Sequence, residues 1–220
     1  MTAALAPLPP TLRRRTRAPV VRLAHLARPD RAQTAAFIAR TYHHHYQANV
    51  APHLMPSLLG LVDGDTQLVA AFGLRRYRGD GLIARYLGRP LSTWLPNTAT
   101  AGAPLELGNL AGDRPGALRA LVRALAPPLA AEGELWLLCT ATRQLRNGLS
   151  HAGTVWQPLA PATRSVLPPE QQSDWGHYFD HDPMVIAIDI PASCRQLGAL
   201  PEMADPAAVA TLRSIAGAQA

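Results

Sequence analysis

Residues 105–147 read LELGNLAGDRPGALRALVRALAPPLAAEGELWLLCTATRQLRN, the most informative segment of the sequence. It predicts an apolar strand, a polar turn with Gly112, Asp113 and Gly116, a helix at 116–131 and a second apolar strand at 135–140. Two strands joined by a helix indicate one parallel βαβ crossover in an α/β sheet. Pro127-Pro128 is expected to break the helix near its end.

Glu106 is the one acidic residue in the first of these strands, between Leu105 and Leu107. A carboxylate in a strand that should be buried costs free energy unless it is paired or takes part in chemistry. Glu106 is therefore the first candidate catalytic residue. The structural alternative is an ion pair with Arg143 or Arg146 that only closes the fold.

The turn after this strand predicts an anion site. Its glycines, and a helix start with Pro115 in the first turn, would direct backbone N–H groups and the positive helix end at a ligand. A buried acid beside such a site suggests group transfer from a phosphate-bearing donor. The candidate donor-binding residues are Leu110, Ala111, Gly112, Arg114, Gly116 and Asn147.

Polar and aromatic residues elsewhere complete the candidate site. The further candidate catalytic residues are Asn109 and Thr140, and the candidates for an acceptor or acyl pocket are Tyr46, Tyr86, Thr142 and Trp175. Each has a structural alternative. The two asparagines, Asn109 and Asn147, suit turns, the two threonines suit helix caps, and the aromatic rings suit packing.

Metal and thiol chemistry are not predicted. Adjacent histidines such as His43-His44-His45 diverge by about 100° each on a helix, so few of them can face one ion. Cys139 lies in an apolar strand, where the pKa of its thiol would rise rather than fall. The absence of lysine excludes Schiff-base chemistry and a phosphate loop of the usual GK[ST] kind.

Length and composition indicate one soluble domain. The 220 residues, 48% of them hydrophobic, can bury a sizeable core without disulfides. The two cysteines, Cys139 and Cys194, favour a reducing, cytoplasmic setting. No apolar run is long enough to span a membrane, so no integral membrane segment is expected.

The charge is divided along the chain. All 21 basic residues are arginines; eight of them stand against one acid in residues 1–40, and thirteen against fourteen acids in 41–220. We expect a disordered tail at 1–19, the folded domain at 20–195 and a partly helical C-terminal extension at 196–220.

A local cluster of arginines lies inside the domain. Its members, which face only Asp80 in the sequence, are Arg75, Arg76, Arg78, Arg85 and Arg89. This basic patch is either a solvated surface or a docking surface for an acidic carrier protein or a nucleotide phosphate. Nucleic-acid binding is not predicted, because aromatic residues are few and are not interleaved with the arginines.

The rest of the chain predicts a mixed order of elements. Further strands are expected at 20–27, 58–62, 67–74, 83–87, 155–160 and 184–190, and further helices at 31–46 and 142–152. With the crossover unit, the order is β-α-β-β-β-β-α-β-α-β-β.

This order is similar to that of the GNAT acyltransferase fold, and the sequence resembles the thermostable hemolysin family. The motifs that carry the resemblance are YQANVAPHLMPSLLGL (46–61), ARYLGRPL (84–91), ELGNLAG (106–112), TATxxLRN (140–147) and WGHYFDHDPMVIAIDI (175–190). The chain departs from the family at Ala84-Arg85, where an acidic residue and Gln are usual. The resemblance implies an α/β fold with a mixed, centrally splayed sheet flanked by helices.

The same block is also similar to acyl-homoserine lactone synthases. That similarity implies an acyltransferase with an acyl-CoA or the phosphopantetheine of an acyl carrier protein as donor, and no tightly bound cofactor. The acceptor would be a small amine that Glu106 orients or deprotonates, and the product an N-acylated signal or secondary metabolite. The alternatives are a membrane-active hemolysin-type protein and a catalytically degenerate GNAT-like binding protein.

Overall fold

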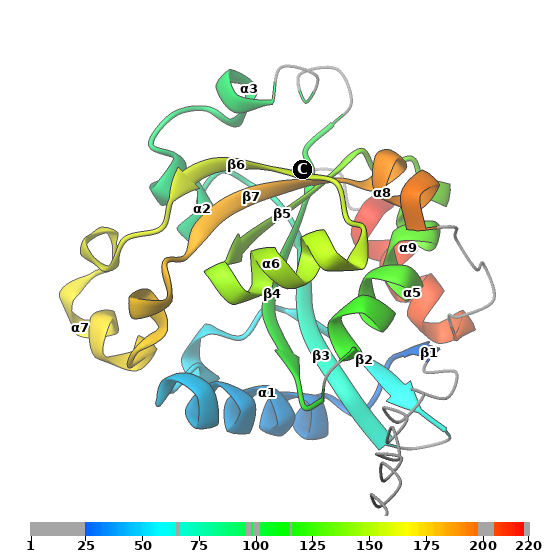
Figure 1. The fold of residues 1–220 in the computed structure, drawn as a ribbon, viewed down its shortest axis with the longest axis horizontal. Helices are drawn as coiled ribbons and strands as arrows, with labels where there is room; N and C mark the ends of the chain where they lie inside the picture. Colours follow the sequence, from blue (N-terminus) through cyan, green and yellow to red (C-terminus); the bar gives the residue numbers. More distant parts are fainter. Residues whose placement is uncertain are drawn as a thin grey trace, which may run out of the picture.

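The fold is built on one seven-stranded mixed sheet (Figure 1). The computed structural model describes residues 25–64, 67–95, 98, 102–114, 116–197 and 205–217, so the predicted tail at 1–19 lies outside the described residues. The strand order is β1-β2-β3-β4-β5-β7-β6. The strands are β1 (His25–Ala27), β2 (Ser57–Asp63), β3 (Gln67–Arg76), β4 (Leu105–Gly112), β5 (Trp136–Ala141), β6 (Trp156–Pro161) and β7 (Met184–Asp189).

One pair of neighbouring strands, β4 and β5, is parallel, and the other pairs are antiparallel. The crossover between them is helix α5 (Ala117–Ala131), as the sequence predicts. The other α-helices are α1 (Arg31–Tyr46), α2 (Leu82–Leu87), α3 (Leu91–Trp94), α6 (Arg143–Ala152), α7 (Pro169–Gln172), α8 (Ile190–Leu197) and α9 (Pro206–Gly217). Among the described residues, no helix combines the length and the apolar character needed to cross a membrane.

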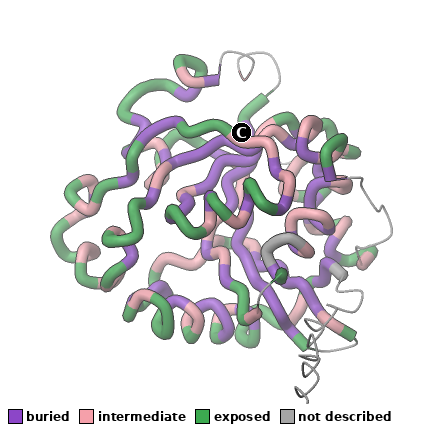
Figure 2. The backbone as a smooth tube through the Cα atoms, viewed as in Figure 1, coloured by how far each residue is buried: buried purple, intermediate pink, exposed green. Residues whose placement is uncertain are grey.

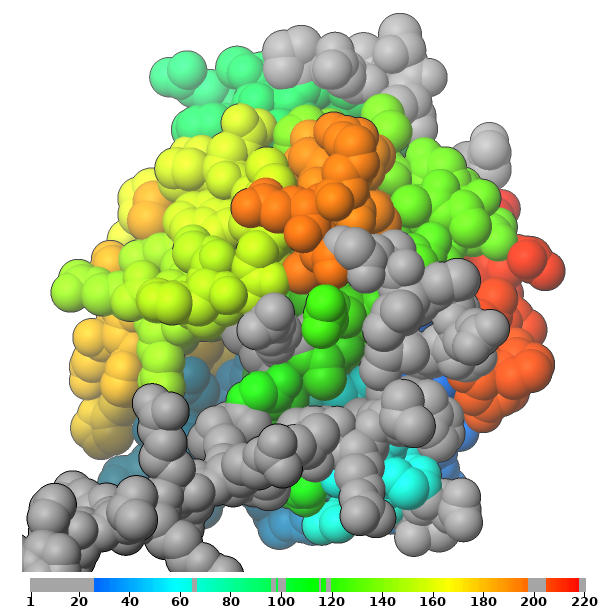
Figure 3. Space-filling view, turned by 45° about the vertical axis from the view of Figure 1, so that its right-hand side comes forward, coloured from blue at the N-terminus to red at the C-terminus, as the bar shows by residue number. Residues whose placement is uncertain are grey.

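Helices cover both faces of the sheet, which is buried in the centre of the molecule (Figure 2). On one face, α5 packs with α6, α8 and α9 over a single apolar cluster; Figure 3 shows these helices side by side. On the other face, α1 covers β2 to β4, whereas α2 covers β5 to β7. The two helices on this second face therefore stand apart, over different halves of the sheet.

Glu106 lies on this second face of the sheet. Its neighbours Leu105 and Leu107 belong to the apolar cluster under α5. Successive side chains of a strand point to opposite faces, so Glu106 points to the face of α1 and α2. The strand alternation thus brings the acid to the region between those two helices.

The centre of the sheet is splayed. The parallel pairing of β4 with β5 covers only 105–107 and 137–139, although β4 continues to Gly112 and β5 to Ala141. Between Gly108 and Ala111, β4 has one more residue than β3 opposite, and Asn109 there has a φ of 51°. Such a bulge bends a strand and raises its twist, which carries the end of β4 away from β5. The predicted mixed, centrally splayed α/β sheet is confirmed.

Two local predictions were wrong. Residues 83–87 form helix α2 rather than a strand, with Gly88 in the left-handed conformation at its end. A short apolar run does not distinguish the two, and here Ile83, Tyr86 and Leu87 lie on one buried helical face. Pro127-Pro128 does not break α5 either, since the helix continues to Ala131. Leucines on both sides of the prolines are buried, and their packing holds this part of the helix in place.

The C-terminal helix α9 packs onto the domain. Ala208 and Leu212 are fully buried in the cluster under α5, and the Asp205 amide donates to the carbonyl of Leu26 at 2.8 Å. The Arg76 guanidinium binds both oxygens of Glu134, at 2.9 and 2.6 Å, and also donates to a carbonyl of α9. The end of β3 is thereby tied to α9.

Candidate active site

Two cavities meet where β4 and β5 part. Each has a volume of about 360 Å³, and both are lined by Gly108 and Asn109 of β4 and by Thr140 of β5. We call the one that contains the buried acid the Glu106 cavity; loop 53–56, α2 and the segment 167–178 form its other walls. We call the second the Gly112 cavity; it lies against the start of α5 and against α6.

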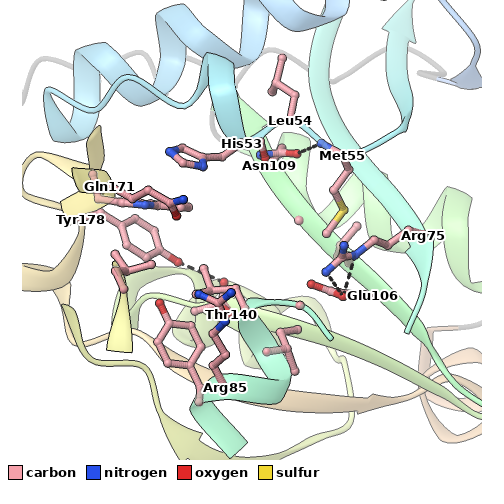
Figure 4. Close-up of a pocket in the computed structure, with 18 of the residues that line it drawn as sticks. His53, Leu54, Met55, Arg75, Arg85, Glu106, Asn109, Thr140, Gln171 and Tyr178 are labelled. Atoms are coloured by element: carbon pink, nitrogen blue, oxygen red, sulfur yellow. Dashed lines mark hydrogen bonds and ion pairs between the residues drawn. The ribbon is translucent and has the colours of Figure 1, made fainter. Parts of the chain in front are cut away.

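An ion pair holds Glu106 in place. Arg75 is its cross-strand partner on β3, and Nε and Nη2 of Arg75 both lie 2.8 Å from Oε2 of Glu106 (Figure 4). The other carboxylate oxygen, Oε1, accepts no hydrogen bond from a described residue. Burial raises the pKa of Glu106, and the Arg75 guanidinium opposes that shift. The carboxylate therefore has one oxygen fixed and one free to accept a proton in the cavity.

The ion pair differs from the structural alternative drawn from the sequence. Arg143 and Arg146 bind Asp182, at 3.3 and 2.7 Å, not Glu106. Their hydrogen bonds hold the pKa of Asp182 below its ordinary value, with Arg146 making the larger contribution. The two arginines thus fix the loop before β7, away from the acid.

Asn109 positions a wall of the Glu106 cavity. Its Oδ1 accepts from the Met55 amide at 2.8 Å, and its Nδ2 donates to the carbonyl of His53 at 3.2 Å. Asparagine tolerates the left-handed backbone of the bulge better than most residues. Asn109 therefore joins the bulge in β4 to the loop after α1, and it acts on that loop rather than only forming a turn.

Several residues that the sequence analysis missed also line the Glu106 cavity. His53 Nε2 lies 2.8 Å from Oδ2 of Asp174, and the His53 ring stacks on Trp175 with 5.3 Å between centroids. Gln171 lies on the same side of the cavity as Tyr178, opposite Arg75 and Glu106 (Figure 4). Loop 53–56 and segment 167–178 meet only in the folded chain, so spacing along the sequence does not indicate their contact.

Tyrosines form the edge shared by the two cavities. Tyr42 of α1 stacks on Tyr178 at 6.3 Å between centroids, and the Tyr178 hydroxyl donates to the Thr140 carbonyl at 3.2 Å. Burial raises the pKa of both phenols well above the ordinary value, so they stay protonated. These rings give the junction an apolar wall in which the Tyr178 hydroxyl is held by a hydrogen bond.

The predicted donor-binding residues gather on the Gly112 cavity, with one exception. Those that line it are Leu110, Ala111, Gly112, Arg114 and Gly116. Helix α5 begins after Gly116, and no side chain caps it. Asn147 is exposed outside this lining, and its carbonyl contacts the ring of His151. Pro115 lies outside the described residues.

The candidates for the acceptor or acyl pocket are divided between the cavities. Tyr86 and Trp175 line the Glu106 cavity, whereas Tyr46 and Thr142 line the Gly112 cavity. The Thr142 hydroxyl also accepts from the Leu145 amide at 3.3 Å, so the capping alternative is realised there. Of these four residues, only Tyr86 and Trp175 share a cavity with Glu106.

The basic patch predicted from the sequence was wrong in part. Arg75 is paired with Glu106 and Arg76 with Glu134, so neither adds free charge to a surface. Arg78, Arg85 and Arg89 are exposed, and none of them forms an ion pair with a described residue. Glu106 of β4 neutralises Arg75, and Glu134, in the turn before β5, neutralises Arg76. Both acids are far from these arginines in the sequence.

The histidine run lies at the end of α1, and Cys139 lies buried in β5. His43, His44 and His45 form the last turn of α1, and the described ranges contain no group of three or more residues placed to hold a metal ion. Burial raises the pKa of the Cys139 thiol to about 12. A thiol so protonated is a poor nucleophile.

Comparison with solved structures shows the class of fold. An N-acyl amino acid synthase from uncultured soil microbes aligns with a TM-score of 0.54 at 14% identity, over 79% of this chain and 94% of that one. A protein assigned as arylalkylamine N-acetyltransferase 7 of the yellow fever mosquito aligns with a TM-score of 0.51 at 10% identity, over 76% and 87%. The acyl-homoserine lactone synthase BjaI aligns with a TM-score of 0.47 at 14% identity, over 87% and 99%. The chain has the GNAT-like acyltransferase fold.

The family follows from the sequence. The model of the family described as thermostable hemolysin matches residues 24–194, which is most of the chain. This protein belongs to the thermostable hemolysin family. A search of curated proteins found no similar sequence.

Proposed function

We propose that this protein is an N-acyltransferase that moves an acyl group from a thioester donor to a small amine. One observation carries the proposal: the Glu106 cavity and the Gly112 cavity meet between the parted ends of β4 and β5. Two substrates that enter from the two cavities would bring their reacting atoms together at Gly108 and Thr140. Holding two reactants in such geometry is a large part of catalysis of bimolecular reactions.

The donor would occupy the Gly112 cavity. A donor with a phosphopantetheine arm carries anionic phosphate groups, and the uncapped start of α5 offers backbone N–H groups and a positive helix end to them. Acyl-CoA and an acyl carrier protein share this arm, and both are candidate donors. The arm would then run along β4 into the gap.

The acceptor amine would occupy the Glu106 cavity. The neutral amine attacks the thioester carbonyl carbon, and the free Oε1 of Glu106 takes one proton from the attacking nitrogen. The C–N bond forms, the C–S bond breaks, and the thiolate leaves; the proton on Glu106 then passes to the thiolate or to solvent. The edge of β4 beyond Leu107 has no strand partner on the side of β5, so its backbone N–H groups are available to the oxyanion.

Glu106→Gln tests the proposal. The variant keeps the shape of the side chain and its contact with Arg75 but cannot accept a proton. Acyl transfer from acyl-CoA and from an acyl carrier protein to a panel of amines is measured by mass spectrometry. We expect a loss of about 10²–10⁴-fold in kcat, the usual contribution of a general base. Glu170→Gln is the matched control, because Glu170 is an exposed acid of α7 outside the cavity.

Three outcomes separate the candidate functions. Transfer by the wild type that is lost in Glu106→Gln and kept in Glu170→Gln supports the proposal. Equal transfer by Glu106→Gln would remove Glu106 from the mechanism. Donor binding by the wild type without transfer to any amine would favour the catalytically degenerate binding protein instead.

A further inference from the structure

A second arginine, Arg85, lines the Glu106 cavity and takes no part in the Arg75–Glu106 ion pair. Arg85 reaches into the cavity from α2 (Figure 4), and its guanidinium makes no hydrogen bond or ion pair with a described residue. Arg75 cannot serve the same purpose, since Glu106 neutralises it at 2.8 Å. The charge available to a ligand in this cavity is therefore the guanidinium of Arg85.

Two further hydrogen-bond donors of the cavity lack partners. The Nε1–H of Trp175 is buried without a hydrogen-bond partner in the described part of the chain. The side-chain amide of Gln171 forms no hydrogen bond with a described residue either, and it lines the same cavity. The buried Trp175 N–H costs free energy while it has no partner, and a ligand acceptor atom would recover that cost. The half-buried Gln171 amide is available as a further donor. Gln171 lies across the cavity from the Arg75–Glu106 pair (Figure 4), and Trp175 and Arg85 line the same cavity.

The opposite end of the cavity is acidic. Glu106 lies there with its free oxygen, and Asp80 is close enough to raise the pKa of Glu106. Asp80 also lines the cavity and forms no ion pair with a described residue. The cavity thus offers acceptor oxygens at one end and a cation with two neutral donors at the other.

We infer that the acceptor is an amino acid, whose amino group lies at Glu106 and whose carboxylate is bound by Arg85, with Gln171 and Trp175 as supporting donors. A guanidinium can form two parallel hydrogen bonds with a carboxylate. An amino acid therefore offers Arg85 a partner of matching geometry, whereas a simple amine offers none. An amine without an anionic group would leave the buried Trp175 N–H without an acceptor and would make no use of the Arg85 charge. This inference rests on the proposed function and narrows its acceptor.

The experiment compares acceptors that differ only in the carboxylate. L-Phenylalanine is paired with phenethylamine, and L-leucine with isopentylamine, and kcat and KM are measured for each with an acyl-CoA donor. We expect the wild type to favour each amino acid over its amine. Arg85→Ala should lower kcat/KM for the amino acids about 10–100-fold, mainly through KM, the range for a hydrogen bond to a charged group. The same variant should leave transfer to the amines unchanged.

Two further variants keep the result specific. Arg85→Lys retains the charge but not the paired geometry, so it should restore part of the loss. Arg89→Ala is the matched control, because Arg89 is exposed on the same segment outside the cavity. Calorimetry measures the binding of L-phenylalanine to the protein without a donor. This binding should weaken in Arg85→Ala and stay unchanged in Arg89→Ala.

The outcomes distinguish the inference from the proposed function. Transfer to the amines that equals transfer to the amino acids, or an equal effect of Arg85→Ala on both, would overturn the inference and leave the N-acyltransferase standing. Transfer to neither kind of acceptor, with either donor, would overturn the proposed function and the inference with it.

Discussion

At the scale of single residues, the Arg75–Glu106 pair controls when the candidate base is ionised. Burial alone would keep the carboxyl protonated over a wider pH range, and the guanidinium 2.8 Å away shifts it toward the charged form. The pair is fixed by cross-strand register, so its geometry depends on the sheet and not on a flexible loop. Arg75 thus positions Glu106 and opposes the rise in its pKa that burial causes.

Arg75→Gln tests this role through pH. Without the guanidinium the pKa of Glu106 rises further, so a reaction that needs the carboxylate should lose its rate at a higher pH. We expect the acidic limb of kcat/KM to move to higher pH in Arg75→Gln and to stay in place in Arg78→Gln, whose side chain is exposed outside the cavity. Arg75→Lys keeps the charge, so its acidic limb should lie between those of the wild type and Arg75→Gln. An unmoved limb in Arg75→Gln would mean that another group is the base.

The same variant should change stability with a defined sign. In Arg75→Gln the folded protein holds the Glu106 proton to a higher pH than the unfolded chain does. The unfolded state then binds fewer protons, so the free energy of unfolding should fall as pH rises through the ordinary carboxyl pKa toward the raised one. Urea unfolding at several pH values measures this slope, with Arg78→Gln as the control.

At the scale of elements, the sequence predicts best where the pattern is local. The strand, turn, helix and strand of 105–141 were placed correctly because alternation, glycine and helical periodicity each act within a few residues. Residues 83–87 form a helix rather than the predicted strand, because five residues are too few to show a period and packing on β5 to β7 decides for a helix.

The site was predictable to the same extent. Glu106 was found because an acid breaks a local apolar pattern, and the glycines of the following turn because they precede a helix. Arg75 and the pair of His53 with Asp174 were not found, because their partners lie 31 and 121 residues away in the chain. Long-range pairing leaves no periodic signal in one sequence.

A contact between two elements gives the next prediction. Gly176, in the segment after η3 (Ser173–Trp175), has a φ of 45°, and the His177 amide donates to the carbonyl of Tyr46 at 2.7 Å. A Cβ on Gly176 would overlap that carbonyl oxygen and lie 2.7 Å from the carbonyl oxygen of Gln47. Gly176→Ala should therefore destabilise the fold by about 2–4 kcal/mol, from backbone strain and steric overlap together.

Gly133→Ala is the matched control for this contact. Gly133 also has a positive φ, 79°, but a Cβ there meets no atom within 4 Å. Only the conformational cost of about 1–2 kcal/mol should remain. Urea unfolding of both variants measures the difference, and equal losses would show that the end of α1 yields to the added methyl group.

At the scale of the whole molecule, the C-terminal helix belongs to the core although the family match ends at residue 194. Leu212 is fully buried beneath α5, and Arg76 connects β3 to α9 and to Glu134. Leu212→Ala should lower the free energy of unfolding by about 2–5 kcal/mol, as for other buried leucines. Ser214→Ala, an exposed position of the same helix, should leave it within about 0.5 kcal/mol. Thermal unfolding compares them, and a small loss for Leu212→Ala would show that α9 contributes little to the fold.

The short seam between β4 and β5 has a consequence for how the chain can be divided. Strands β1 to β4 come from one continuous stretch of sequence and β5 to β7 from the next, so the sheet consists of two contiguous halves joined by pairing at only three positions of each strand. Each half keeps all its other strand pairs if the seam widens. If the proposed donor occupies the gap, widening it would break only the pairing of 105–107 with 137–139 and leave every other strand pair intact. Two polypeptides cut within 113–116 would each carry an intact half-sheet, which makes that turn the natural place to divide the protein into fragments that reassemble.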